Sequence, residues 1–278
     1  MQRLKIVALM TSLTVIVMGV GMYFGGSPVT MFLIAAAMNF GSYWFSDRMV
    51  LRMYRAQIVD RTQAPELYAM VERLAHRAQL PMPVVAIAPS DQPNAFATGR
   101  SPAKGVVCFT QGILKALPMD ELEGVTAHEL GHIKHRHMLV GAIAATLAGM
   151  IMMLSRFAMF FGGGGRGRDR NSHPVALIAM MILAPIAAML VRMAISRQNE
   201  YQADRTGAEI AGRPQGLASA LRRMDALAHQ IPMDVNPAAA SLAIVNPLAG
   251  RRGLGLASLI STHPSTEERV ARLEALAR

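Results

Sequence analysis

Residues 119–138 read MDELEGVTAHELGHIKHRHM, and the five residues His128-Glu129-Leu130-Gly131-His132 at their centre decide the fold. The stretch is helix-compatible throughout, so the two histidines, four positions apart, lie on one face of a helix about 6 Å from each other. Two imidazoles so placed can bind one Zn²⁺ ion at Zn–N distances of about 2.0–2.1 Å. Glu129 lies beside that metal, where it can take a proton from the water that the metal activates and pass it to a leaving amine. The motif therefore predicts two metal ligands and a general base on one helix.

Two protein ligands leave a catalytic zinc site incomplete, because such sites usually have three and keep the fourth position for water. The extended form of the motif has a third histidine six positions after the second, but Met138 stands there. Glu200 is the best candidate instead, with Asp204 one helical turn further along. This spacing suits a liganding carboxylate followed by a second carboxylate that accepts the free N–H of a metal-bound histidine. Two ordinary solvated acids fit the spacing equally well.

Three neighbouring residues need their own interpretation. His135 and His137 follow His132 at positions +3 and +5, and on a continuous helix neither easily reaches the same ion. We interpret them as polar residues at a membrane surface. Gly131 costs a helix about 1 kcal/mol relative to alanine, which the close approach of another element would explain.

The composition indicates a membrane protein. Of the 278 residues, 52% are hydrophobic and 17% are charged, whereas soluble domains have about 25% charged residues. Residues 6–46 contain no charged side chain, and Gly25-Gly26-Ser27-Pro28 divides them into the apolar stretches Ile6–Phe24 and Val29–Phe45. Each is long enough to cross about 30 Å of hydrocarbon. A cleaved signal peptide is excluded by the length of the first stretch and by the second one that follows it, so we predict a helical hairpin anchor.

A second apolar pair, at residues 138–155 and 174–191, is separated by the glycine-rich linker 162–170. Both members could span the membrane, insert partly, or pack on the soluble domain. We predict four segments: an N-terminal transmembrane hairpin at 1–47, the first half of a catalytic domain at 48–137, a second hydrophobic hairpin at 138–195, and the second half of the catalytic domain at 196–278.

The formal net charge of +10 is compatible with nucleic-acid binding. Its placement argues against that reading, because basic residues flank the uncharged run, where they set membrane topology. These residues are Arg3, Lys5, Arg48, Arg52, Arg55 and Arg61. We therefore predict no nucleic-acid partner and a soluble part on the cytoplasmic side. The single cysteine, Cys108, forms no intrachain disulfide and is compatible with a reducing compartment.

The soluble part contains helices and a few strands. The pattern predicts an amphipathic helix at 64–80, a helix at 196–228 broken near 212–214, and a final helix that begins with a capping box at 265–268. Short apolar runs at 84–88, 95–99 and 105–110 predict a small antiparallel sheet. The predicted fold class is α+β and mainly helical, with up to four transmembrane helices.

Taken together, these motifs resemble the HtpX-type membrane zinc metalloproteases, which are gluzincins related to the CAAX prenyl endopeptidases. The resemblance covers nearly the whole chain and rests on the order and spacing of its parts rather than on any one of them. The parts are the N-terminal hairpin, Asn94–Gly99, the motif at 128–132, the hydrophobic pair between the two halves of the site, Glu200–Asp204, and Ser261–Pro264.

The resemblance implies a zinc metalloendopeptidase with one Zn²⁺ ion per chain. His128, His132 and Glu200 would bind the metal, Glu129 would be the catalytic base, and Asp204 would support a liganding histidine. The family acts on misfolded or damaged membrane proteins in bacterial envelope quality control and the stress response. The resemblance therefore implies protein or peptide substrates, a lipid bilayer as partner, and a multi-pass protein of the bacterial inner membrane with a cytoplasmic catalytic domain.

The resemblance also gives Asn94, Ala95 and Phe96 a candidate role. An exposed edge strand beside the zinc would pair with the substrate backbone, which recognises extended peptides with little selectivity for side chains. A purely structural hairpin is equally compatible with the sequence. His263 could stabilise the oxyanion or simply precede the last helix. The competing function is a non-enzymatic membrane adaptor whose structural zinc is closed by a fourth ligand, such as His135 or His263.

Overall fold

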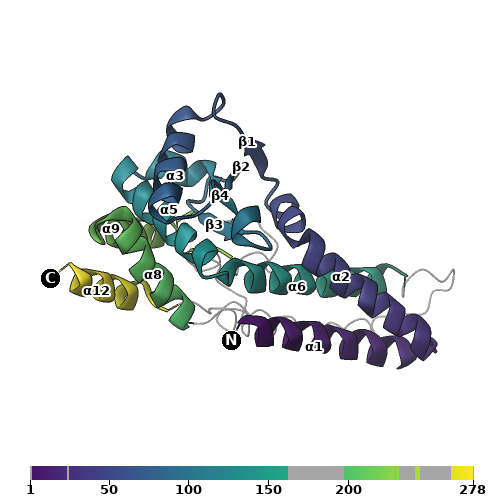
Figure 1. Ribbon diagram of the computed structural model, residues 1–278. Coiled ribbons are helices and arrows are strands. Elements are labelled where there is room, and N and C mark those ends of the chain that lie inside the picture. The colour runs from purple at the N-terminus through teal and green to yellow at the C-terminus, as the bar shows by residue number, and fades with distance from the viewer. Residues whose placement is uncertain are drawn as a thin grey trace.

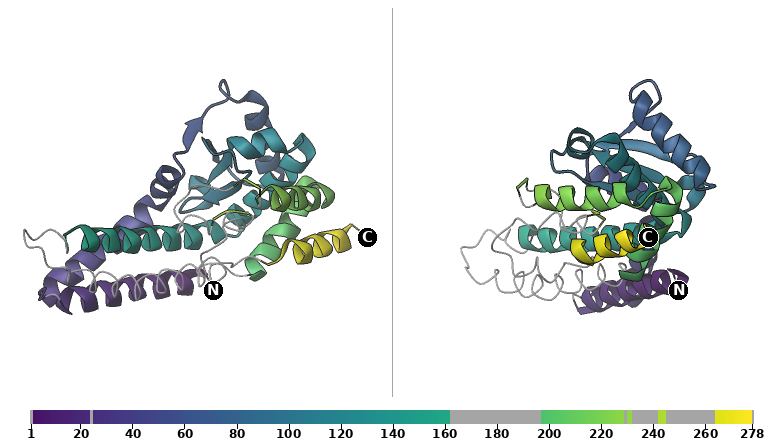
Figure 2. Two further views of the ribbon diagram at one scale, coloured as in Figure 1. Left: turned by 180° about the vertical axis from the view of Figure 1, so that it is seen from behind. Right: turned by 90° about the vertical axis from the view of Figure 1, so that its left-hand side faces the viewer.

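The computed structural model describes residues 2–23, 25–161, 197–228, 230–231, 242–244 and 264–277. Three long helices extend from one side of a body that holds the sheet and the shorter helices (Figure 1). They are α1 (Gln2–Tyr23), α2 (Pro28–Met53) and α6 (His137–Phe161). All three pack on one another, and the views of Figure 2 show the same arrangement.

The break between α1 and α2 lies where the sequence predicts it. Gly25 has a φ of +83°, a left-handed conformation that favours glycine. Ser27 then caps α2, its hydroxyl accepting a hydrogen bond from the Thr30 N–H at 3.5 Å, and Pro28 occupies the first turn. α2 continues to Met53, further than predicted, and the chain then enters the sheet.

One described helix, α2, is long and apolar enough to cross a membrane. Within the described residues, α1 and α6 contain shorter apolar segments, Leu4–Gly19 and His137–Ala148. The predicted span at 174–191 and the linker at 162–170 lie outside the described residues. Four spans are therefore not confirmed.

The sheet has four strands in the order β1-β2-β4-β3. These are β1 (Gln57–Val59), β2 (Val84–Ala88), β3 (Ala95–Thr98) and β4 (Val106–Thr110). The pairs β1–β2 and β3–β4 are antiparallel, but β2 and β4 run parallel, so the prediction of an antiparallel sheet is wrong. After β2, the chain first forms β3 at the edge of the sheet. It then returns through the short helix η1 (Pro102–Lys104) and adds β4 between β2 and β3. β1 is too short and too exposed to show an apolar pattern.

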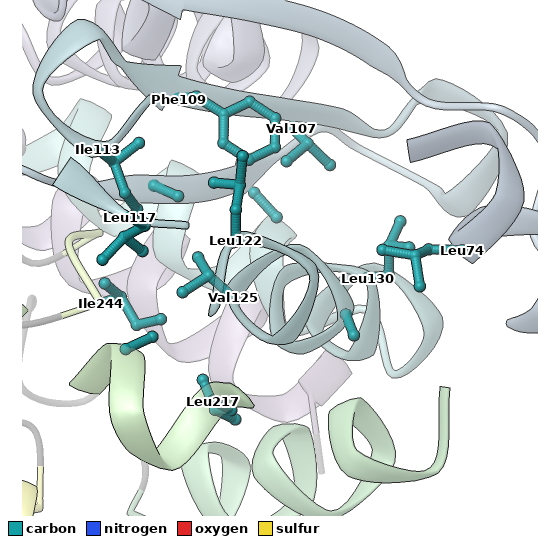
Figure 3. Close-up of a cluster of buried hydrophobic side chains, with 14 of the residues drawn as sticks. Leu74, Val107, Phe109, Ile113, Leu117, Leu122, Val125, Leu130, Leu217 and Ile244 are labelled. Atoms are coloured by element: carbon teal, nitrogen blue, oxygen red, sulfur yellow. The ribbon is translucent and has the colours of Figure 1, made fainter. Parts of the chain in front are cut away.

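The body is built around α5 (Met119–Lys134), which is buried against the sheet on one side and two helices on the other. The remaining helices are α3 (Pro65–Arg77), α4 (Gln111–Ala116), α8 (Arg197–Ala211), α9 (Gln215–Ala228) and α12 (Thr266–Leu276). Figure 3 shows the core that α5 joins, where Leu122 and Val125 meet Phe109 of β4 and Leu217 of α9. The predicted apolar face of α3 is buried in the same core.

Glycines let α8 cross α5 at short distance. A Cβ atom at Gly131 would lie 3.1 Å from the carbonyl oxygen of Ala203, and one at Gly207 would lie 2.9 Å from the backbone of His128. The predicted close approach at Gly131 is thereby confirmed, and Ala203 of α8 is what approaches. This crossing places the acidic residues of α8 beside the histidines of α5.

One further helix end differs from the prediction. α5 stops at Lys134 instead of continuing to Met138, because Arg136 adopts a φ of +59° and turns the chain before α6 begins. In α12, Ser265 caps the helix as predicted, accepting from the Glu268 N–H at 3.2 Å. Its buried face holds Val270, Leu273 and the charged Arg269, which is 2% exposed, whereas Leu276 is 45% exposed.

Candidate metal centre and active site

Two histidines of α5 and a glutamate of α8 meet at the crossing of these helices. The Nε2 atoms of His128 and His132 lie 3.1 Å apart. Glu200 places Oε2 at 3.8 Å from His128 Nε2 and Oε1 at 3.6 Å from His132 Nε2. One ligand atom from each of the three residues lies within 4.8 Å of the others, so the structure brings together the three predicted metal ligands.

The donor set fits a zinc ion. Two ligand atoms at about 2.0–2.1 Å from one tetrahedral ion lie about 3.3 Å from each other, close to the separations of 3.1, 3.6 and 3.8 Å found here. Imidazole nitrogen and carboxylate oxygen are ordinary zinc ligands. Burial lowers the pKa of His132 well below its usual value, although Glu200 opposes this, so its ring is neutral, as a ligand must be.

Asp204 lies behind His128, one turn of α8 beyond Glu200. Its Oδ1 is 2.9 Å from His128 Nδ1, which places the ring proton on Nδ1 and leaves the Nε2 lone pair facing the cluster. Burial would raise the pKa of Asp204, but the charge of Arg269 and hydrogen bonds from His128 and Arg269 lower it to about 2. Asp204 is therefore an anion at neutral pH.

Arg269 of α12 completes this side of the site, and sequence reasoning missed it. Its Nε and Nη2 donate to the two carboxylate oxygens of Asp204 at 3.0 and 2.7 Å. Nη2 also lies 3.4 Å from both ring nitrogens of His128, and Nη1 lies 3.7 Å from Glu200 Oε2. The guanidinium thus balances two carboxylates in a buried site. Its only sequence signal is a charge beside the apolar positions of a helix, which is typical of a solvated arginine.

Glu129 is a third buried carboxyl group, beside Glu200 and Asp204, and is 4% exposed. Burial raises its pKa to about 7; the charge of Glu200 adds to this effect, while His128, the Ala97 N–H and Arg269 oppose it. A carboxyl group with this pKa can hold and release a proton near neutral pH. The nearby thiol of Cys108 is unsuited to chemistry, because burial raises its pKa and keeps it protonated.

The strand predicted to bind substrate is at the edge of the sheet, beside α5, but it is covered. Asn94, Ala95 and Phe96 are each buried, so the expectation of an exposed strand is wrong for this conformation. The Phe96 ring packs on Tyr54 near the end of α2, with ring centroids 4.3 Å apart. Asn94 Oδ1 accepts a hydrogen bond from the Ile244 N–H at 3.1 Å, so the segment 242–244 lies against the start of β3.

The structure also corrects the interpretation of His137 as a surface residue. His137 is buried, and its Nδ1 lies 3.3 Å from Nδ1 of His132. The spacing argument assumed a continuous helix, but α5 ends at Lys134, and Arg136, with its positive φ, turns the chain back. His135 instead contacts α8 through Thr206 at 2.9 Å. His263 lies outside the described residues.

Comparison with known proteins places these features in a family. Residues 61–277 match the model of peptidase family M48. The chain is 56% identical to the "Protease HtpX homolog" of Gemmatimonas aurantiaca, with 100% of both chains covered. It is 55% identical to the protein of that name from Salinibacter ruber, covering 100% of this chain and 99% of the relative. For Methylibium petroleiphilum the identity is 52%, with 98% and 97% covered.

Among solved structures, the chain resembles S. mikatae Ste24p, with 19% sequence identity and a TM-score of 0.49. The match covers 95% of this chain but 62% of that one. The chain thus spans less than two thirds of the solved structure, whereas it spans essentially the full length of the curated relatives.

Proposed function

Because the chain belongs to peptidase family M48 and is a membrane metalloprotease, we propose that its buried cluster binds one catalytic zinc ion. His128 and His132 supply the imidazole nitrogens and Glu200 supplies a carboxylate oxygen. Asp204 fixes the ring of His128 so that Nε2 faces the metal. Arg269 in turn holds both oxygens of Asp204.

The zinc ion, when bound, activates a water molecule and polarises the scissile carbonyl group. Glu129 accepts, on its carboxylate, the proton that the attacking water loses, and delivers it to the nitrogen of the leaving amine. A pKa of about 7 suits both transfers, because the group must exchange its proton readily in each direction. The Ala97 N–H bonds the carboxylate and so ties the base to the edge strand β3.

The observation that carries this proposal is the convergence of three ligand atoms beside a buried carboxyl group on the same helix. A structural zinc site usually has four protein ligands. Among the described residues the cluster has three, and the side chain of His135 bonds Thr206 and Gln202 instead. Together with the peptidase family of the relatives, this leaves the non-enzymatic adaptor unsupported.

We place the protein in the bacterial inner membrane as a multi-pass protein with its catalytic body in the cytoplasm. Its proposed substrates are misfolded or damaged membrane proteins of the envelope. The apolar helix α2 supports the membrane setting, and the edge position of β3 supports unselective pairing with extended chains. Asn94, Ala95 and Phe96 are buried and the Ile244 N–H bonds the Asn94 side chain, so a substrate strand can add here only once the residues that cover them move.

The test is the Glu129→Gln variant of the full chain, purified in detergent with zinc. Removing the base while keeping the shape should lower casein cleavage by roughly 10²- to 10⁴-fold, with zinc content unchanged. Glu66→Gln, an exposed glutamate of α3, is the matched control and should cleave at the wild-type rate. Cleavage by Glu129→Gln at the wild-type rate would refute the mechanism.

A further inference from the structure

We propose that His137 is a positioning residue that holds His132 in the orientation and tautomer in which its Nε2 faces the metal. The inference rests on the proposed function, because it assumes that His132 is a ligand. Its basis is the contact between the two Nδ1 atoms, 3.3 Å apart, and the packing of the two rings at a centroid distance of 5.3 Å. It adds to the site a residue that lies at the first position of α6.

The hydrogen-bonding roles follow from the position of the metal cluster. His132 points Nε2 at His128 and Glu200, so a metal held there needs the lone pair of that nitrogen. A neutral imidazole then carries its proton on Nδ1. That N–H donates to His137 Nδ1, which must be unprotonated, so the proton of His137 resides on Nε2. The contact thus selects the tautomer of His132 that can bind a metal.

His137 is itself oriented from α8 through a continuous chain of hydrogen bonds. The Gln202 side chain bonds the His137 ring, and its Nε2 lies 3.2 Å from His135 Nδ1. His135 Nε2 lies 2.9 Å from the Thr206 hydroxyl. With His132 as the first donor, each later group can accept from one neighbour and donate to the next, and Thr206 accepts at the end. The direction of donation along the whole series of hydrogen bonds is therefore set by His132, the metal ligand.

The burial of the His137 imidazole and the backbone turn before it are not typical of a surface residue. His137 is 7% exposed although it follows a turn, because the positive φ of Arg136 folds it back over the end of α5. A non-glycine residue in this conformation is uncommon and strained. The strain accompanies a direct contact between the start of α6 and a metal ligand.

The experiment measures the affinity of full-length protein in detergent for Zn²⁺, by competition with a coloured chelator. His137→Asn places an amide oxygen where Nδ1 lies, and it can accept from His132. His137→Leu has nearly the same shape but no acceptor. We expect His137→Asn to bind zinc within about threefold of wild type, and His137→Leu to bind it about 10- to 100-fold more weakly, the usual effect of losing such a partner.

Two further measurements separate positioning from folding. His76→Ala, which removes an exposed imidazole of α3, should leave zinc affinity unchanged. In cobalt-loaded protein, the visible absorption bands should keep their wild-type energies in His137→Asn and shift in His137→Leu, because the bands report the orientation of the ligands.

Each outcome bears on one of the two proposals. Equal zinc affinity for His137→Leu and wild type would overturn the positioning role, as would equal losses in His137→Leu and His137→Asn. A wild-type protein that fails to bind one zinc ion per chain would instead refute the proposed function. A folded His137→Leu protein with weak zinc binding, restored in His137→Asn, supports the inference.

Discussion

The two histidines of the cluster have opposite surroundings. His128 is backed by a carboxylate and a guanidinium, both buried, which come from α8 and α12. His132 is backed by a neutral imidazole at the start of α6, and its side chain is 15% exposed. Charge therefore fixes one proposed ligand, and a backbone turn fixes the other. We therefore expect substitutions on the His128 side to act by leaving a buried charge unpaired. Substitutions on the His132 side should act by changing the orientation of the His132 ring.

The largest effect should come from breaking the charged side. Asp204→Ala leaves Arg269 buried without its main counter-charge, which typically costs about 3–5 kcal/mol of folding free energy, and it removes the partner of His128. We expect a lower thermal midpoint and loss of bound zinc. Asp91→Ala, at an exposed ion pair, is the control and should change stability by less than about 1 kcal/mol.

The double variant Asp204→Leu/Arg269→Met can show whether the unpaired guanidinium causes this loss of stability. Removing both charges should recover much of the stability that Asp204→Leu alone loses, because no unpaired charge stays buried. A double variant less stable than Asp204→Leu would show that the loss does not come from the stranded guanidinium.

Burial of Glu129 should make the stability of the zinc-free protein depend on pH. Its pKa is about 7 in the folded chain against an ordinary value of 4.5, so the folded state keeps a proton that the unfolded state releases. Stability should therefore fall as the pH rises from about 4.5 to about 7, by on the order of 3 kcal/mol. Denaturant unfolding after chelation tests this, and Glu129→Gln should remove the decline.

Asp204 should give the opposite slope in acid. Its pKa of about 2 lies below the ordinary value of 3.8. Its contribution is fully present above pH 3.8 and is lost as the pH falls towards 2. Asp204→Asn should flatten this acid limb without altering the decline assigned to Glu129. Unchanged acid unfolding in Asp204→Asn would argue against the ion pair as its source.

A moderate effect should distinguish the two glycines where α8 crosses α5. An added Cβ at Gly207 meets the His128 backbone at 2.9 Å, so the helices must separate, at a typical overpacking cost of about 1–3 kcal/mol. Gly131→Ala meets the Ala203 carbonyl oxygen at 3.1 Å, a contact that a shift of a few tenths of an ångström relieves, while the better helix propensity of alanine, about 1 kcal/mol, applies to both positions. Gly207→Ala should therefore lower the unfolding midpoint and zinc affinity more than Gly131→Ala. Equal effects would contradict this ranking.

The smallest effect should come from making the two sides alike. His137→Asp gives His132 a carboxylate partner like that of His128, which raises the basicity of the ligand. Zinc affinity should increase by roughly threefold to tenfold, which chelator competition can resolve. Unchanged affinity would mean that the charge of the partner does not matter on this side.

What the sequence predicts here follows from local periodicity. The pairs His128–His132 and Glu200–Asp204 are each four residues apart, and α5 and α8 keep those pairs on one face. The strands could likewise be found, but the parallel pairing of β2 with β4 depends on the path of the chain between them. The presence of a strand depends on its local sequence, whereas the direction in which two strands pair does not.

The rest depends on contacts between segments distant in sequence, or on one backbone angle. Arg269 meets Asp204 across 65 residues, and nothing near Arg269 in the sequence indicates an anionic partner. His137 was misread because helical spacing was extended through Arg136, whose positive φ ends the helix. No residue type at that position signals the turn, since arginine is an ordinary helix former.

The separation of the site's parts along the chain also fixes the order in which they can assemble during synthesis. The ribosome produces the base and two histidines first, Glu200 follows the apolar stretches at 138–155 and 174–191, and Arg269 comes 141 residues after His128. Every shorter nascent chain lacks either the third ligand or the guanidinium. The proposed zinc site is therefore complete only after the apolar middle of the chain has been synthesised, and we expect no cleavage before that point.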